Sequence, residues 1–201
     1  RVRELWAAQG VLVNELAKPV AVLNLAVAGA DVAARLVQTA AAAGEPVHLS
    51  LRVLTRCTPA WRPGQCVFVC ENPAILAAAA DTLGARCPSM VSLDGQLSAA
   101  PRTLLDQLAA RDAEFHYHGD FDWGGLRIAN VLFGRYRVVP WHFGASDYQP
   151  TAGPTLQGPP AVASWDAALG PKMQKAGIAI HEESLLDLLL ADLRHASSGT
   201  A

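Results

Sequence analysis

The chain has 201 residues, of which 51% are hydrophobic, and its formal net charge is −2. A chain of this size and composition can bury a real hydrophobic core and most simply forms one domain. Its apolar runs are broken by proline, glycine or charge well short of the roughly 18 residues that a membrane-spanning helix needs. Its first residues do not resemble a signal peptide. We therefore expect no association with a membrane.

The charge balance limits how the chain could bind nucleic acid. Phosphate contacts need clustered Lys and Arg, so a net charge of −2 argues against binding by bulk positive charge alone. A catalytic domain can still be mildly acidic when metal ions neutralise its carboxylates and another domain grips the duplex. Because the chain begins at Arg1 without a methionine, we expect it to be a piece of a longer protein.

Apolar β-rich segments alternate along the chain with alanine- and leucine-rich helical segments, a pattern typical of α/β proteins. The first part predicts a strand at 20–29, a helix at 30–44 and a strand at 47–54, a unit that either extends the main sheet or flanks it. The core predicts strands at 65–70, 89–93, 114–118 and 136–141, separated by helices at 72–84, 99–111 and 124–135. Short crossovers of this kind produce a parallel sheet.

The remaining segments complete the predicted organisation. Ser98 is expected to cap the helix at 99–111. Residues 144–164 are rich in Pro, Gly and Ser and predict a long surface loop, and a helix follows at 182–194. We divide the single domain into an N-terminal α/β extension, a central α/β core, and a loop with C-terminal helices, at residues 1–64, 65–143 and 144–201.

The four cysteines favour a reducing compartment. Their spacing contains no paired CxxC, which makes a structural zinc site improbable. Cys66 and Cys70 would lie on one face of the predicted strand at 65–70, as core residues do. This pattern predicts a cytoplasmic protein with free thiols.

Three carboxylates follow predicted strands of the core. Glu71 ends the strand at 65–70, and Asp120 and Asp122 follow the strand at 114–118, within FHYHGDFDWGGLRIAN (115–130). Open α/β sheets bind ligands just outside the carboxyl ends of their strands, so neighbouring strands would bring these groups into one crevice. Crowded carboxylates repel one another unless a cation such as Mg²⁺ or Mn²⁺ offsets them. Gly124 and Gly125 would leave room there for a phosphate backbone.

These motifs resemble a known fold. CENPAIL (70–76) and YHGDFDWGGLRIAN (117–130) are similar to the Toprim fold shared by topoisomerases, primases and several nucleases. With LWAAQGVL (5–12), GEPVHLSLR (44–52) and HEESLLDLLLADL (181–193), they resemble the C-terminal domain of the D subunit of Wadjet-type systems. In these systems a bacterial condensin-like complex recognises plasmid DNA, and this subunit cuts it.

The resemblance implies a fold and an activity. The fold is a Toprim-like, doubly wound α/β sheet with a mostly parallel core, flanking helices and an N-terminal strand–helix–strand extension. Glu71, Asp120 and Asp122 would be the catalytic residues that hold Mg²⁺ or Mn²⁺ in a DNA endonuclease. None of the three tyrosines is an obvious nucleophile, which favours hydrolysis over transesterification.

The resemblance also implies partners. Those expected are double-stranded plasmid DNA, the SMC/condensin-like subunits and the N-terminal domains of the same protein. A homodimer is compatible with such an assembly.

Four further residues are weaker candidates for phosphate contacts or for supporting the metal ligands. His118 is nearest to the aspartates, although a strand histidine is more often a core residue. Arg127 could contact a phosphate or merely balance the carboxylates. Ser98 and Glu182 complete the set, and Glu182, with Glu183, could simply stabilise the start of the last helix.

The acidic residues could also have a purely structural role or serve a different chemistry. Asp120 and Asp122 could be only turn and cap residues, and Glu71 could favour the N-terminus of its own helix. A phosphatase of the haloacid dehalogenase type would use the DxD pair as nucleophile and acid. A non-catalytic Toprim scaffold that binds condensin partners would not use the carboxylates at all.

Overall fold

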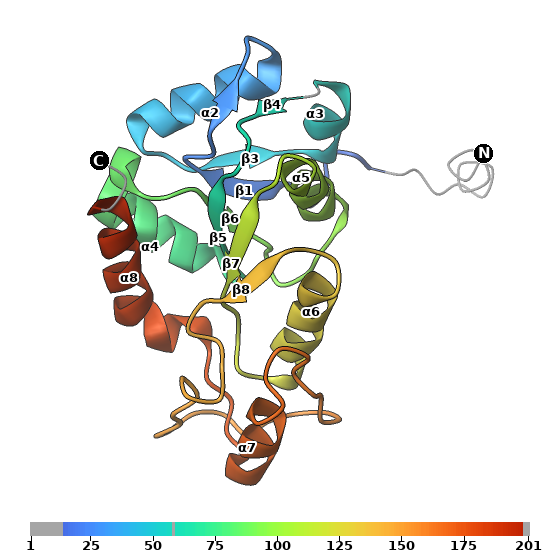
Figure 1. Ribbon diagram of the computed structural model, residues 1–201, viewed down its shortest axis with the longest axis vertical. Coiled ribbons are helices and arrows are strands. Elements are labelled where there is room, and N and C mark those ends of the chain that lie inside the picture. The colour runs from blue at the N-terminus through green and yellow to red at the C-terminus, as the bar shows by residue number, and fades with distance from the viewer. Residues whose placement is uncertain (1–13, 58, 199–201) are drawn as a thin grey trace, which may run out of the picture.

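A computed structural model describes residues 14–57 and 59–198. Its centre is a six-stranded sheet with the order β3–β1–β6–β5–β7–β8 (Figure 1). The strands are β1 (Val20–Leu23), β3 (Val47–Leu49), β5 (Cys66–Cys70), β6 (Met90–Ser92), β7 (Glu114–Tyr117) and β8 (Val138–Pro140). The last four pair in parallel, whereas β1 runs antiparallel to both of its neighbours. The fold is therefore α/β with a mostly parallel sheet.

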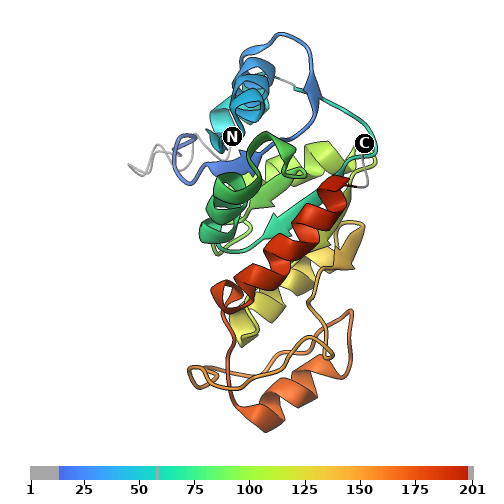
Figure 2. The same cartoon turned by 90° about the vertical axis from the view of Figure 1, so that its left-hand side faces the viewer.

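Helices cover both faces of this sheet because buried side chains point alternately to one face and to the other along a strand. On one face, Val67 and Val69 pack with α2 (Val32–Ala43), α5 (Ala99–Ala109) and α6 (Trp123–Phe133). On the other face, Phe68 and Cys70 pack with α4 (Pro73–Leu83) and α8 (Leu186–Ser198). Figure 2 shows α8 lying along this second face. The two layers of helices bury the sheet between them.

The order of the strands creates a topological switch point. The chain passes from β5 through α4 to β6, then crosses back over β5 through α5 to β7, and continues through α6 to β8. The direction of winding therefore reverses, and the helices after β5 and β7 lie on opposite faces. In open α/β sheets, ligands bind beyond the carboxyl ends of the strands at such a switch point.

Most of the core elements lie within two residues of the predicted bounds, but the N-terminal part differs. The strand predicted at 20–29 is interrupted at Asn24, which has a positive φ of 52°, and only β2 (Val27–Ala28) follows it, paired with β4 (Ala60–Trp61). The strand predicted at 47–54 ends at Leu49. The Ser50 Oγ accepts a hydrogen bond from the Val53 N–H at 3.3 Å and starts α3 (Leu51–Arg56).

Two expectations about single side chains were wrong. Ser98 occupies the N-cap position of α5, but its side chain makes no capping hydrogen bond. Cys66 is exposed rather than part of the core, although Cys70 is buried.

The segment after β8 is more ordered than a plain surface loop. It buries Tyr148 and contains α7 (Leu169–Ala176), a helix that we did not predict. The predicted last helix begins with a 3-10 turn, η2 (Glu182–Leu185), before α8. Ile180, two residues before this turn, forms a bridge with Phe121, which brings the C-terminal segment to the end of β7.

The N-terminal extension joins the main sheet, because β1 and β3 are two of its six strands. The segment at 5–12 that contributes to the resemblance lies outside the described residues. Within residues 14–57 and 59–198, no helix combines the length and the apolar character needed to cross a bilayer.

Candidate functional site

Two of the three predicted carboxylates meet at the switch point. Glu71 directly follows β5, and Asp120 lies three residues after the end of β7. The two strands pair in parallel, with Val69 opposite Tyr117, so the loops that follow them are adjacent. The Asp120 N–H lies 3.4 Å from Glu71 Oε2, a long hydrogen bond between the two loops. Two residues that are 49 positions apart in the sequence thus share one acidic site.

The environment of Glu71 disfavours its negative charge. Burial raises the pKa of Glu71 to about 7, and the nearby charges of Asp120 and Asp122 add to this rise. Among the described residues, the buried hydroxyl of Tyr117 beside this loop has no hydrogen-bond partner. A bound cation would stabilise a group of carboxylates of this kind.

Glycines in the motif allow these close approaches. A Cβ on Gly119 would lie 2.5 Å from the Tyr117 hydroxyl and 3.0 Å from Glu71 Oε2. A Cβ on Gly125 would lie 2.1 Å from the Asp120 carbonyl oxygen. Gly125 is therefore required for the turn to pack on itself, a reason different from the phosphate approach that we expected.

Asp122 performs the capping role that its position before a helix allowed. Its Oδ1 accepts a hydrogen bond from the Gly125 N–H at 2.7 Å and caps α6. Among the described residues, Asp122 Oδ2 has no hydrogen-bond partner. One oxygen of this carboxylate thus holds the helix while the other is unused.

Glu182 joins the site from the far end of the sequence. Its side chain is fully buried. Its Oε1 accepts a hydrogen bond from the Glu71 N–H at 3.1 Å, and its Oε2 accepts one from the Asn72 N–H at 2.6 Å. The Glu182 N–H donates in turn to Asp120 Oδ1 at 2.8 Å. Glu182 therefore ties the loop after β5 to the loop after β7.

Burial raises the pKa of Glu182 well above its usual value. A buried carboxylate of this kind persists only where hydrogen bonds satisfy its oxygens, as the two backbone N–H groups do here. Glu182 thus holds the backbone of Glu71 and Asn72 in place, and its expected role beside metal ligands stays a prediction.

Sequence reasoning missed two polar residues at this edge. His181 Nδ1 lies 3.2 Å from Asp120 Oδ2, and this hydrogen bond raises the pKa of the half-exposed imidazole. Asp94 follows β6, and the next residue, Gly95, donates its N–H to the Glu71 carbonyl at 3.2 Å. In the sequence, Asp94 can be found as an acidic residue that follows a predicted strand, and His181 as the neighbour of Glu182.

The other three weaker candidates do not join the carboxylates. His118 is buried, and its Nδ1 donates to the Trp141 carbonyl at 2.8 Å. The guanidinium of Arg127 is exposed and donates to the Pro159 carbonyl, so it fastens the segment after β8. Ser98 lies before α5 and donates its N–H to the Gln96 carbonyl at 2.7 Å. None of these contacts involves the carboxylates of the site.

The donor set fits a hard divalent cation in its chemistry. Carboxylate oxygens are the ligands that Mg²⁺ and Mn²⁺ prefer. In the described part of the chain, however, no three His, Cys, Asp or Glu side chains are already arranged around one point as ligands. Oxygens of Asp120 and Asp122 instead accept hydrogen bonds from backbone N–H groups. The site therefore has oxygen atoms that suit such a cation, but some of these oxygens accept hydrogen bonds from the protein itself.

Comparison with known proteins bears on the family. A family model described as "Protein of unknown function C-terminus (DUF2399)" matches residues 47–193, from β3 into α8. No curated protein and no solved structure matches the chain. The matched region includes Glu71, Asp120, Asp122 and Glu182. The match spans well over half of the sequence, and the chain therefore belongs to the DUF2399 family.

Proposed function

We propose that this chain is the nuclease domain of a Wadjet-type D subunit, a divalent-metal-dependent phosphodiesterase that cuts plasmid DNA. The observation that carries the proposal is the approach of Glu71 and Asp120 at the switch point of the sheet. The matched family describes the C-terminus of a protein, in agreement with the resemblance to a C-terminal domain. A Toprim-like fold is part of the same proposal.

The proposed Toprim assignment is supported by where the acidic residues lie. One carboxylate follows β5, and a pair follows β7, which is its parallel neighbour. Helices on both faces of a mostly parallel sheet are compatible with this fold. The antiparallel β1 and its partner β3 are the N-terminal extension in this scheme.

The proposed chemistry divides between the cation and the chain. Glu71, Asp120 and Asp122 would hold Mg²⁺ or Mn²⁺, which when bound supplies an activated water and stabilises the leaving oxygen of the phosphodiester. Glu182 fixes the backbone of Glu71, and its own N–H orients Asp120. His181, half exposed beside Asp120, can donate a hydrogen bond to a phosphate at the mouth of the site.

The proposed partners follow from the charge of the chain. Its net charge of −2 gives little general attraction for a duplex. We propose that the N-terminal domains of the same protein and the SMC/condensin-like subunits present the DNA. The compartment would then be the cytoplasm, where plasmids lie.

The proposal predicts metal-dependent nicking of supercoiled plasmid by the full-length subunit in its condensin complex. Asp120→Asn removes one charge with little change of shape, and we expect it to reduce the rate by on the order of 100-fold. The matched control is Asp112→Asn, because Asp112 is exposed and has a positive φ of 60° that asparagine tolerates. The measurement is the loss of supercoiled plasmid on gels.

Two outcomes of this assay have a definite meaning. Full nicking activity by the complex carrying Asp120→Asn, with metal present, would exclude the carboxylates from the reaction. Equal loss in the Asp112→Asn control would show that the assay reports folding or assembly instead.

A non-catalytic scaffold is the second candidate, and one observation favours it. The Asp120, Asp122 and Glu182 carboxylates all accept hydrogen bonds from backbone N–H groups, which is a sufficient structural role. A scaffold needs no cation, so metal binding by these residues distinguishes the two proposals.

A further inference from the structure

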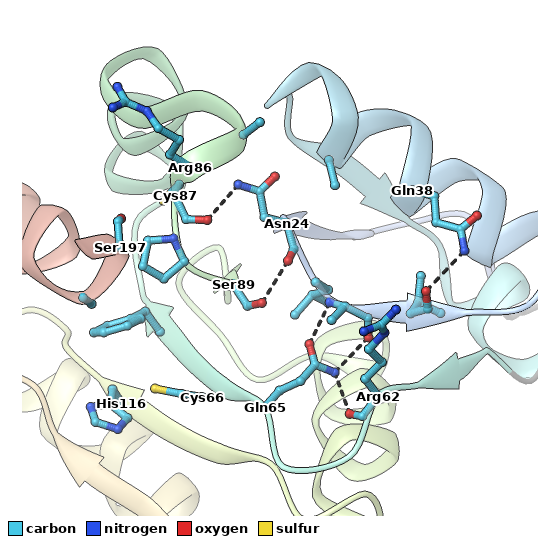
Figure 3. Close-up of a pocket in the computed structure, with 18 residues that line it drawn as sticks. Asn24, Gln38, Arg62, Gln65, Cys66, Arg86, Cys87, Ser89, His116 and Ser197 are labelled. Carbon is cyan, nitrogen blue, oxygen red and sulfur yellow. Dashed lines mark hydrogen bonds between the residues drawn. The ribbon is translucent and has the colours of Figure 1, made fainter. Parts of the chain in front are cut away.

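A cavity lies at the end of the sheet opposite the carboxylates. Its volume is about 870 Å³, within the range of sites that bind small organic ligands. It lies at the amino ends of β5 and β6, where Cys66 and Ser89 form part of its wall (Figure 3). Segments after β1 and the last turn of α8 complete it. It shares no residue with the acidic site.

Hydrogen bonds hold the polar wall of this cavity in place. Gln65 is buried, and its amide accepts from the Ala26 N–H at 2.7 Å and donates to the Ala26 carbonyl at 3.0 Å. The Ser89 hydroxyl donates to the Asn24 carbonyl at 2.9 Å. Asn24 Oδ1 is buried and has no hydrogen-bond partner in the part of the chain that the structure describes. The cavity is therefore formed before any ligand arrives, which lowers the entropic cost of binding.

The permanently charged side chains of the cavity wall are arginines. Among the described residues, no Asp or Glu contributes to this wall, whereas Arg62 and Arg86 both do. Glu114 is not part of the wall, although its Oε1 lies 3.1 Å from Nε2 of His116, which is. Neither guanidinium has a carboxylate within ion-pair distance among the described residues, unlike Arg135, which lies 2.9 Å from Asp106. Unpaired guanidinium groups at a preformed cavity favour an anion, and their planar fork suits phosphate.

The remaining wall is apolar and aromatic. The rings of Phe68 and His116 lie side by side, with 5.2 Å between their centroids. Leu25 and Val27 contribute aliphatic surface. Figure 3 shows His116 and Arg62 on opposite sides of the cavity, and Arg86 at its rim with the guanidinium turned outward. A ligand that spans the cavity would thus meet rings at one side and a cation at the other.

We propose that this cavity binds a nucleotide, with the base against Phe68 and His116 and the phosphate at Arg62. A flat, mostly apolar heterocycle that carries a phosphate matches both sides of the wall. Arg86 would contribute less than Arg62, because its guanidinium has to swing inward. This inference does not depend on the proposed nuclease activity.

The experiment is calorimetric titration of the full chain with AMP, ADP, GMP and GDP in EDTA, so that no metal can bridge a phosphate to the carboxylates. We expect saturable binding at one site by at least one of these probes. Adenosine alone and inorganic phosphate alone should each bind at least about tenfold more weakly, since each uses only one side of the cavity.

Variants locate the bound nucleotide. Arg62→Gln should weaken binding by about tenfold or more, and Arg86→Gln by less. Ala85→Trp, at an exposed position that lines the cavity, should block binding by filling it. Arg102→Gln is the matched control, because Arg102 is an exposed arginine on α5 outside the cavity. It should leave binding unchanged.

Three outcomes would overturn the inference. They are the absence of saturable binding by all four nucleotides, equal affinity of wild type and Arg62→Gln, and loss of binding in Asp120→Asn. The last would place the nucleotide at the carboxylates instead. Because the titration needs neither metal nor cleavage, failure of the nuclease proposal would leave its result unaffected.

Discussion

His118 is a single residue whose titration should affect the stability of the whole chain. Burial lowers its pKa to about 4, while the hydrogen bond to the Trp141 carbonyl opposes this fall. The ring donates from Nδ1 to the Trp141 carbonyl, while Nε2 is buried and has no hydrogen-bond partner within residues 14–57 and 59–198. A second proton on this ring would therefore have to be buried without a hydrogen bond, which makes the charged form costly.

The sign of the pH dependence follows from the different proton binding of His118 in the folded and the unfolded chain. The unfolded chain, with an ordinary histidine pKa of about 6.5, binds a proton that the folded chain rejects until about pH 4. The contribution of His118 to the free energy of unfolding is thus complete above about pH 6.5 and is lost as the pH falls toward 4. Between pH 7 and pH 5 the loss should reach about 2 kcal/mol.

The measurement is urea unfolding of wild type and His118→Asn at several pH values. Asparagine can still donate to the Trp141 carbonyl but does not titrate, so the variant should lose less stability than wild type over this interval. Both proteins contain the other histidines, whose effects cancel in the comparison. Parallel curves for the two proteins would show that His118 is not buried in its neutral form.

At the scale of elements, three segments far apart in the sequence meet through one side chain. Glu182 in η2 accepts hydrogen bonds from the loop after β5, and its N–H donates to the loop after β7. Glu182→Ala would leave the N–H groups of Glu71 and Asn72 without these partners in a buried place. We expect it to lower the free energy of unfolding by about 2–5 kcal/mol. Glu182→Gln retains one acceptor, and its cost should be about 1–3 kcal/mol.

The adjacent Glu183 provides the control for this prediction. It is exposed, and its Oε1 accepts from the Asn72 side chain, a contact that glutamine can also make. Glu183→Gln should change the free energy of unfolding by less than about 0.5 kcal/mol in the same denaturation experiment. If Glu182→Gln unfolded at the same urea concentration as this control, Glu182 would not be the link between the two loops.

The elements that were predictable from the sequence are those with a strong local signal. β5 and α4 follow from a continuous apolar run, Pro73 at the helix start and Gly84 after its end. The segment at 47–54 was assigned wrongly because its apolar residues suit a strand and a short helix equally, and the Ser50 cap decides between them. α7 was missed because Gly170 and Pro171 weaken its helical pattern.

Within the candidate site, too, residues with a local sequence signal were predictable, whereas contacts between distant segments were not. Glu71 and Asp120 could be predicted because each follows a strand, and parallel neighbours end at the same edge. The role of Glu182 could not, because it depends on a contact with Glu71 across 111 residues. His118 adjoins the acidic motif in sequence, yet its ring packs with Phe121 and Phe143, so sequence proximity was a poor guide.

In the whole molecule, the acidic site and the arginine-lined cavity lie at opposite ends of the sheet. Carboxylates gather at the carboxyl ends of β5 and β7, and the arginine-lined cavity lies at the other end. Helix α8 begins directly after the η2 turn that holds Glu182, and its last turn lines the cavity. The consecutive segments η2 and α8 therefore extend from the acidic site to the cavity.

Divalent metal binding is the property of the whole molecule on which the nuclease and the scaffold differ. In the nuclease, Mg²⁺ or Mn²⁺ binds the folded chain only, and so raises its melting temperature by mass action. At a hundred times the Kd this amounts to about 2.7 kcal/mol, or roughly 5–10 °C for a chain of this size.

The comparison is with the variant Glu71→Gln/Asp120→Asn/Asp122→Asn. It removes all three charges, while an asparagine at 122 can still cap α6. The variant should fold and lose the metal-dependent shift, both in thermal unfolding and in calorimetric titration. The same metal affinity in wild type and variant would remove these carboxylates from any metal site and leave the scaffold as their role.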